Sequence, residues 1–170
     1  MGYSTDFFGK FNLDKKLTDD QAEYLRLYSD TRHCTRRGST SNLMDRLNIP
    51  FGKDGEFVAE IEDNYFSNSK KDRDSYRTLV IDYNDPPGDC PGLWCNWAPT
   101  KDNFGIEWNG AEKFYNYVEW LNFILENFLV PWGYNLTGYV RFQGEDQFDK
   151  GYIRIKNNFA YIDLENLIFD

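Results

Sequence analysis

Two cysteines in a proline- and glycine-rich stretch, PPGDCPGLWCNW at residues 86–97, are the first candidates for chemistry. Cys90 and Cys95 are separated by four residues, whereas zinc knuckles and thioredoxin-like sites use a two-residue spacing. A tetrahedral zinc would need two further ligands, and only the adjacent pair His33 and Cys34 could supply them. The pattern therefore favours structural packing, with zinc as the alternative. We expect Cys95 to be a small buried apolar residue.

The second candidate is the group of carboxylates in GEDQFDK, which joins two predicted strands. Glu145, Asp146 and Asp149 offer the hard oxygen ligands that magnesium and calcium prefer. Their spacing does not match the alternating calcium-loop pattern, and a hairpin tip is also an ordinary place for solvated acids. They stay weak metal candidates, and no cofactor is expected.

Catalytic carboxylates are a further possibility, because Glu107 and Glu112 flank the start of a predicted helix. Glycosidases need two such groups facing each other across a cleft, and the sequence does not place them so. No nucleophile motif or phosphate-binding loop is present. Enzymatic activity is therefore uncertain and less expected than binding.

The third candidate is a surface on the predicted hairpin of residues 136–156. Side chains alternate along a strand, so each strand has an apolar and a polar side. If the strands are in register, one side carries Tyr139, Arg141, Tyr152, Arg154 and Lys156. The opposite, core side would then carry Val140, Phe142, Ile153 and Ile155. Aromatic and cationic side chains on open sheets stack bases and hold phosphates, and they also anchor protein interfaces. A solvated face with cross-strand pairs is the simpler alternative.

Trp94 is a sixth candidate binding residue. It lies in the predicted strand LWCNWAPT, on the opposite side from Leu93, Cys95 and Trp97.

Two amphipathic helices are predicted to position these candidates. LTDDQAEYLRLYSDTRH begins with a capping box, in which Thr18 and Gln21 each bond the other's backbone N–H. A second helix is predicted to start at Asn109, with Glu112 completing an Asn-x-x-Glu box. Its apolar stripe follows the helical period over Phe114, Tyr117, Val118, Leu121, Ile124, Leu125 and Phe128. Pro131 is expected to end it.

The other periodic segments are predicted strands. They span residues 5–13, 77–84, 93–100, 102–108, 136–143, 151–156 and 159–164. Residues 36–76 show no clear period, and we interpret them as a long irregular insertion. This order of elements predicts one α+β domain over residues 1–170, with a mostly antiparallel sheet and two main helices packed on one face.

The composition limits the possible partners. The net charge is −9, and residues 78–170 carry most of the excess negative charge, which disfavours nucleic acid and anionic membranes as partners. No apolar run is long enough to span a membrane, and no signal peptide is recognised. Together with the odd number of three cysteines, these features predict a cytoplasmic protein with reduced thiols.

The stretches GYSTDFFGKFNLDKKLT, PPG, PGLWCNWAPT, EWNGAEKFYNYVEWLNFILENFLVPWGYNLTGYVRFQGED and DKGYIRIKNN resemble a family of uncharacterised proteins. That family is encoded by phages, prophages and other mobile elements of bacteria. The resemblance covers most of the chain except residues 36–76. It implies a small accessory protein in a bacterial host cell and supplies no mechanism.

These observations together predict a non-enzymatic accessory binding protein that contacts a host protein. The alternative is a nucleic-acid or small-ligand binder that uses the aromatic and basic side of the hairpin. The sequence does not predict the identity of the partner or the oligomeric state.

Overall fold

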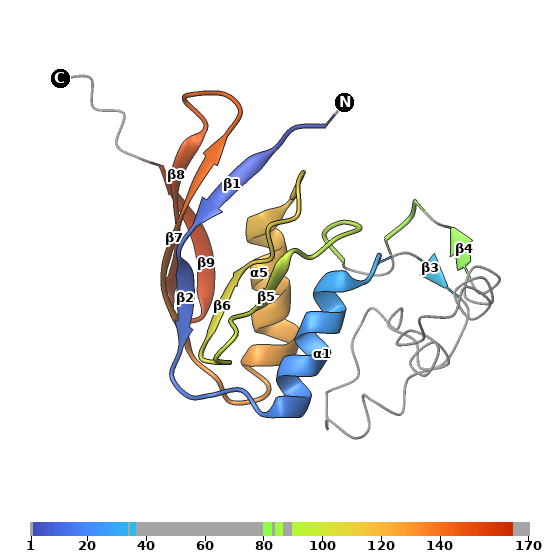
Figure 1. The fold of residues 1–170 in the computed structure, drawn as a ribbon, viewed down its shortest axis with the longest axis vertical. Coiled ribbons are helices and arrows are strands. Elements are labelled where there is room, and N and C mark those ends of the chain that lie inside the picture. Colours follow the sequence, from blue (N-terminus) through green and yellow to red (C-terminus); the bar gives the residue numbers. More distant parts are fainter. Residues whose placement is uncertain (1, 34, 37–79, 83, 87–89, 165–170) are drawn as a thin grey trace. The chain divides into compact units, whose positions relative to one another are not determined.

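The computed structural model describes residues 2–33, 35–36, 80–82, 84–86 and 90–164 (Figure 1). The chain divides into two compact units. The first combines Met1–Asp30 with Trp94–Asp170, and the second is Thr31–Leu93. The prediction of a single domain over the whole chain stays a prediction.

The second unit contains a short antiparallel ladder between β3 (Thr35–Arg36) and β4 (Val80–Asp82). Nearby, Arg32 Nη2 donates a hydrogen bond to Asn84 Oδ1 at 3.1 Å. Most of the predicted insertion, residues 37–76, lies outside the described residues, so its irregular structure also stays a prediction.

The first unit is built on a seven-stranded sheet whose described strand pairs are all antiparallel. Its strands are β1 (Thr5–Phe8), β2 (Lys10–Leu13), β5 (Trp97–Pro99), β6 (Gly105–Trp108), β7 (Leu136–Gly144), β8 (Lys150–Lys156) and β9 (Phe159–Leu164). Six of them are hydrogen-bonded in the order β5-β6-β2-β7-β8-β9, and β1 also pairs with β7. The predicted α+β fold with a mostly antiparallel sheet is confirmed.

Gly9 divides the first predicted strand into β1 and β2, which follow one edge of β7 in a single register. Phe8 lies opposite Arg141, and Phe11 lies opposite Gly138, so the register with β7 is the same before and after Gly9. Gly9 and Gly138 both have φ of 103°, a conformation that residues with a Cβ rarely adopt. The continuous strand predicted for this segment is therefore kinked at a glycine, which allows the sheet to bend.

Two helices pack on one face of this sheet, as predicted (Figure 1). The first, α1 (Asp19–Asp30), begins with the predicted capping box. Thr18 N–H donates to Gln21 Oε1 at 3.3 Å, and Gln21 N–H donates to Thr18 Oγ1 at 3.1 Å. The second, α5 (Tyr117–Ile124), continues as the π-helical turn η2 (Leu125–Leu129).

The second helix begins later than predicted. Asn109 does not cap it, because Asn109 Oδ1 accepts a hydrogen bond from Ala111 N–H at 2.9 Å in the turn after β6. Lys113 and Asn116 then have φ of 61° and 55°, left-handed conformations that interrupt any α-helix before Tyr117. The predicted capping box at Asn109 is therefore wrong.

A side-chain amide joins α5 to the edge strand β9. Asn122 Nδ2 donates to the Ala160 carbonyl at 3.0 Å, and Asn122 Oδ1 accepts from the Ala160 N–H at 2.7 Å. These two bonds satisfy backbone groups of β9 that do not pair with β8, and they hold the helix against the sheet.

The core between the helices and the sheet is mostly aromatic. The Phe7 ring lies within 5.0–5.7 Å, between centroids, of the rings of Trp97, Trp108, Phe114 and Tyr117. A second cluster joins α1 to α5 and η2, where Phe128 meets Tyr24 at 5.3 Å and Tyr28 at 5.1 Å. Leu121 and Phe128 are both 0% exposed, which confirms that these two residues of the predicted helical stripe are buried.

The burial of Phe128 gives a stability prediction. We expect Phe128→Ala to lower the free energy of unfolding by about 3–5 kcal/mol, because a large ring is removed from a close-packed cluster. The matched control is Phe148→Ala, since Phe148 is 61% exposed and should cost less than about 0.5 kcal/mol. Urea denaturation measures both. Equal effects of the two substitutions would contradict the packing described.

Candidate aromatic and basic binding face

The hairpin residues predicted to share one side do share it. Tyr139 lies opposite Arg154, and Arg141 lies opposite Tyr152. Val140 and Ile153, which alternate with them, are 0% exposed against the helices.

We call the side of the sheet turned away from the helices the outer face. Its aromatic and basic members on β1, β2, β7, β8 and β9 are Phe8, Lys10, Tyr139, Arg141, Lys150, Tyr152, Arg154, Lys156, Phe159 and Tyr161.

Aromatic and cationic side chains alternate across the strands of the outer face. One row of paired residues runs from Tyr139 through Arg154 to Tyr161. The neighbouring row contains Phe8, Arg141, Tyr152 and Asp163. In these two rows Arg154 and Arg141 each have an aromatic residue on either side, a cross-strand arrangement that stabilises antiparallel sheets.

Arg154 is at the centre of this arrangement. Its Cζ lies 5.2 Å from the centroid of the Tyr139 ring and 4.9 Å from that of Tyr152. The two rings meet edge to face at 5.5 Å, and Arg154 Nε donates to Asp163 Oδ2 at 2.7 Å. The guanidinium is attracted to the electron-rich faces of both rings. Its position is thus fixed from three sides.

The outer face also presents a large area of ring surface to solvent. The exposed fractions are 51% for Phe8, 55% for Tyr139, 60% for Phe159 and 38% for Tyr161. Isolated exposed apolar residues are normal, but exposed rings gathered on one face of three strands form a patch of the kind that marks binding sites.

The local charge of the outer face is opposite to that of the whole chain. On its described strands the cations Lys10, Arg141, Lys150, Arg154 and Lys156 outnumber the carboxylates Asp6, Glu107 and Asp163. The chain as a whole has a net charge of −9. Any partner of this face therefore meets a local excess of positive charge.

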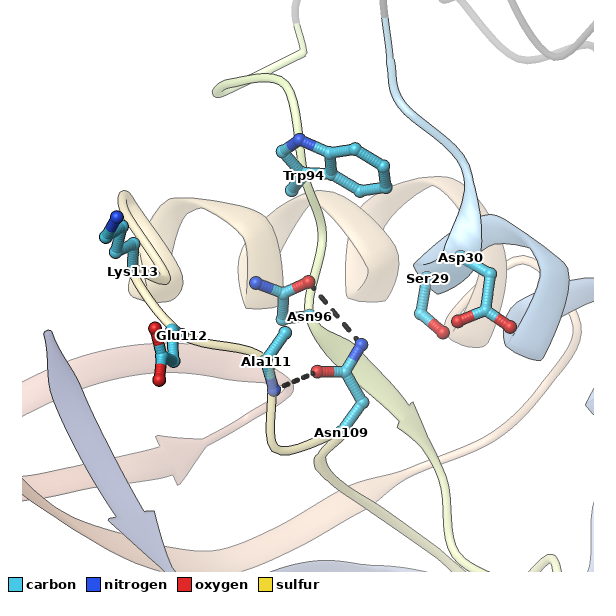
Figure 2. Close-up of a pocket in the computed structure, with 8 residues that line it drawn as sticks. All are labelled: Ser29, Asp30, Trp94, Asn96, Asn109, Ala111, Glu112 and Lys113. Atoms are coloured by element: carbon cyan, nitrogen blue, oxygen red, sulfur yellow. Dashed lines mark hydrogen bonds between the residues drawn. The ribbon is translucent and has the colours of Figure 1, made fainter. Parts of the chain in front are cut away.

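Two of the predicted binding residues lie away from the centre of the outer face. Lys156 is paired with Phe159 at the end of β8, at the margin. Trp94 does not belong to this face, because it precedes β5 and lines a separate pocket of about 300 Å³ (Figure 2). The other four, Tyr139, Arg141, Tyr152 and Arg154, form the central rows.

The carboxylates of the β7–β8 turn hold the N-terminal segment. Asp149 Oδ2 accepts a hydrogen bond from the Tyr3 hydroxyl at 2.7 Å, and Glu145 Oε1 accepts from the Ser4 N–H at 2.7 Å. The Asp146 N–H donates to the Tyr3 hydroxyl oxygen at 3.1 Å. The three weak metal candidates thus help to fasten the start of β1 to the end of β7.

The environment of Tyr3 is consistent with this role. The Asp146 N–H lowers the pKa of the Tyr3 hydroxyl, but the hydrogen bond to Asp149, desolvation and the negative charges nearby together raise it above its ordinary value. Among the residues that the structure describes, no three His, Cys, Asp or Glu side chains are grouped so that they could hold a metal ion.

The cysteines of the opening motif have different environments. Cys95 is a thiol with 0% exposure, as predicted, and its Sγ lies 4.0 Å from the Trp97 carbonyl oxygen. Cys90 is a half-buried thiol. Cys34, one of the two remaining candidate zinc ligands, lies outside the described residues.

The sequence analysis missed several residues of the outer face: Phe8, Lys10, Lys150, Phe159, Tyr161 and Asp163. The signal was present in FAYIDL, where Phe159, Tyr161 and Asp163 alternate with apolar residues. The turn at Asn157 and Asn158, whose φ values are 51° and 58°, fixes the register of β9 on β8. Continuing the alternation across this turn would have placed Asp163 on the same face as Arg154.

Comparisons with known proteins found no family model that matches the chain, and no curated protein or solved structure that is similar to it. Within the described ranges, no helix has both the length and the apolar character needed to cross a membrane. The resemblance to a phage and mobile-element family stays a prediction.

The position of Arg154 gives a second prediction. Arg154→Ala should lower the free energy of unfolding by about 1–2 kcal/mol, because it removes two cation–π contacts and an exposed ion pair. Arg154→Lys should recover less than half of the loss, since an ammonium does not stack on two rings as a planar guanidinium does. Lys156→Ala, at the margin of the same strand, is the control and should have little effect. Thermal or urea melts measure these changes, and an Arg154→Lys variant as stable as the parent would refute the stacking role.

Proposed function

We propose that the chain is a non-enzymatic accessory binding protein whose outer face docks an acidic segment of a protein of the bacterial host. The observation that carries this proposal is the arrangement of exposed rings and stacked cations on the side of the sheet turned away from the two described helices. Tyrosine and arginine are the residue types that most often anchor protein interfaces. Here they are held in place before binding, which reduces the entropy that an interface must overcome.

The charge of the outer face favours an acidic partner. The overall net charge of −9 opposes such a partner at long range, but charges farther apart than about 8 Å are largely screened at physiological ionic strength. At contact distance the local excess of Lys and Arg side chains dominates. Complementary charge of this kind increases the rate of association and excludes basic partners.

Single-stranded nucleic acid is the competing partner, because stacked tyrosines and arginines also bind bases and phosphates. Two features count against it. Asp163 already neutralises the Arg154 guanidinium at 2.7 Å, and that guanidinium occupies the region over the Tyr139 and Tyr152 rings. The phosphate contacts that dominate nucleic-acid affinity also require more unneutralised cations than this face provides.

The setting of the proposed function is the cytoplasm of the host cell, with the protein encoded by a phage or another mobile element. This part rests on the sequence resemblance and on the reduced thiols expected from the odd number of cysteines.

A comparative capture experiment tests the proposal. The parent protein and a Tyr139→Ser/Phe159→Ser variant are used as baits in nuclease-treated bacterial lysate. Both substituted residues are more than half exposed, so the fold should be kept. The control bait carries Phe104→Ser, because Phe104 is 47% exposed in the β5–β6 turn. We expect a protein that the parent and the control capture and the outer-face variant loses, with capture weakening as salt increases.

Two outcomes would contradict the proposal. One is that no captured protein distinguishes the outer-face variant from the parent. The other comes from a fluorescence titration with mixed-sequence single-stranded oligonucleotides. Micromolar or tighter binding at physiological salt, lost in the outer-face variant, would assign the face to nucleic acid instead.

A further inference from the structure

The pocket that contains Trp94 lies within the first unit and shares no residue with the outer face (Figure 2). It has a volume of about 300 Å³, at the small end of the range for ligand sites. Its lining comes from the end of α1, the segment before β5 and the turn after β6, and comprises Ser29, Asp30, Trp94, Asn96, Asn109, Ala111, Glu112 and Lys113.

A chain of hydrogen bonds fixes the orientation of two amides in this pocket. The Ala111 N–H donates to Asn109 Oδ1 at 2.9 Å, so the Asn109 amide nitrogen must be the atom that faces Asn96. Asn109 Nδ2 in turn donates to Asn96 Oδ1 at 3.4 Å. The Asn109 N–H also bonds the Asn96 carbonyl at 2.9 Å, which locks the two backbones together. The Asn96 amide nitrogen is thereby directed away from Asn109, as Figure 2 shows.

The orientation of Asn96 leaves its amide nitrogen as a donor that a ligand can use. Asn96 is only 3% exposed, and no described residue accepts a hydrogen bond from its Nδ2. The arrangement therefore presents a fixed donor to whatever fills the pocket.

The rest of the lining defines the chemistry of a ligand. The indole of Trp94 is 40% exposed, and it offers a flat apolar surface for stacking. Asp30 and Glu112 supply carboxylate acceptors, and partial burial raises the pKa of the Asp30 carboxyl above its ordinary value. With one cation, Lys113, beside two acids, the pocket is unsuited to a phosphate or another anion.

We infer that this pocket binds a single pyranose unit of a neutral carbohydrate. Sugar hydroxyls both donate and accept hydrogen bonds, so one ring can accept from Asn96 Nδ2 and donate to the Asp30 or Glu112 carboxylate. The C–H face of a pyranose matches the flat indole of Trp94. A neutral ligand also agrees with the charge of the lining. This site is independent of the proposed protein docking on the outer face.

The test is a titration of the full chain with D-glucose, D-galactose, D-mannose and N-acetylglucosamine, followed by tryptophan fluorescence and by the side-chain amide NMR signals of Asn96. At least one of these sugars should bind, with a dissociation constant in the micromolar to millimolar range. Trp94→Ala should weaken binding by about tenfold or more, because it removes the stacking surface. Asn96→Leu should weaken it similarly by removing the amide donor.

Controls separate this site from the rest of the protein. Phe104→Ala and the outer-face variant Tyr139→Ser/Phe159→Ser should keep the parent affinity for the sugar. If Asn96→Leu does not fold, Asn109→Ala replaces it, since it removes the bond that orients the Asn96 amide. The inference is overturned if no sugar binds at tens of millimolar, if binding is insensitive to these pocket substitutions, or if adenosine or uridine binds and the sugars do not.

Discussion

The register of β7 decides which side chains form the core and which form the outer face. This strand pairs with β1 and β2 along one edge and with β8 along the other. A slip of one residue would bury Tyr139 and Arg141 and expose Val140 and Phe142. The glycine kinks at Gly9 and Gly138 let the strands bend while the register is kept.

Three sets of contacts hold this register from different directions. On the outer face, Arg154 bridges the rings of β7 and β8 to Asp163 of β9. At the end of the hairpin, the Tyr3 hydroxyl bonds Asp149 and the Asp146 N–H. On the helical side, Asn122 of α5 bonds both backbone groups of Ala160. The interactions that make the outer face rigid are therefore largely the ones that make the sheet stable, so function and stability are coupled there.

The sequence predicted the parts of the molecule that local patterns control. Strict alternation in the hairpin placed Tyr139, Arg141, Tyr152 and Arg154 together, and the Thr18–Gln21 capping box marked the start of α1. Where a local signal had two possible uses, prediction failed. Asn109 has the side chain of a helix cap, yet its amide bonds Ala111 and Asn96 in a turn.

Features that depend on tertiary structure could not be predicted. Lys113 and Asn116 have left-handed conformations, so the second helix starts later than predicted. Lysine rarely adopts this conformation, so the residue type at position 113 could not predict it. Trp94 was predicted to be a binding residue in a strand outside the hairpin, and only the fold shows that it lines a pocket of its own. The same holds for Asn96, whose burial follows from the packing of α1, β5 and the turn after β6.

The central claim is tested most directly by NMR. A soluble paramagnetic reagent broadens the signals of accessible aromatic rings, and these signals are recorded before and after addition of the captured partner. The account predicts that the rings of Phe8, Tyr139 and Tyr161 are broadened in the isolated protein and protected in the complex. The Phe104 ring, which is also exposed, should be broadened in both states. Outer-face rings that are protected in the isolated protein, or that stay fully accessible in the complex, would contradict it.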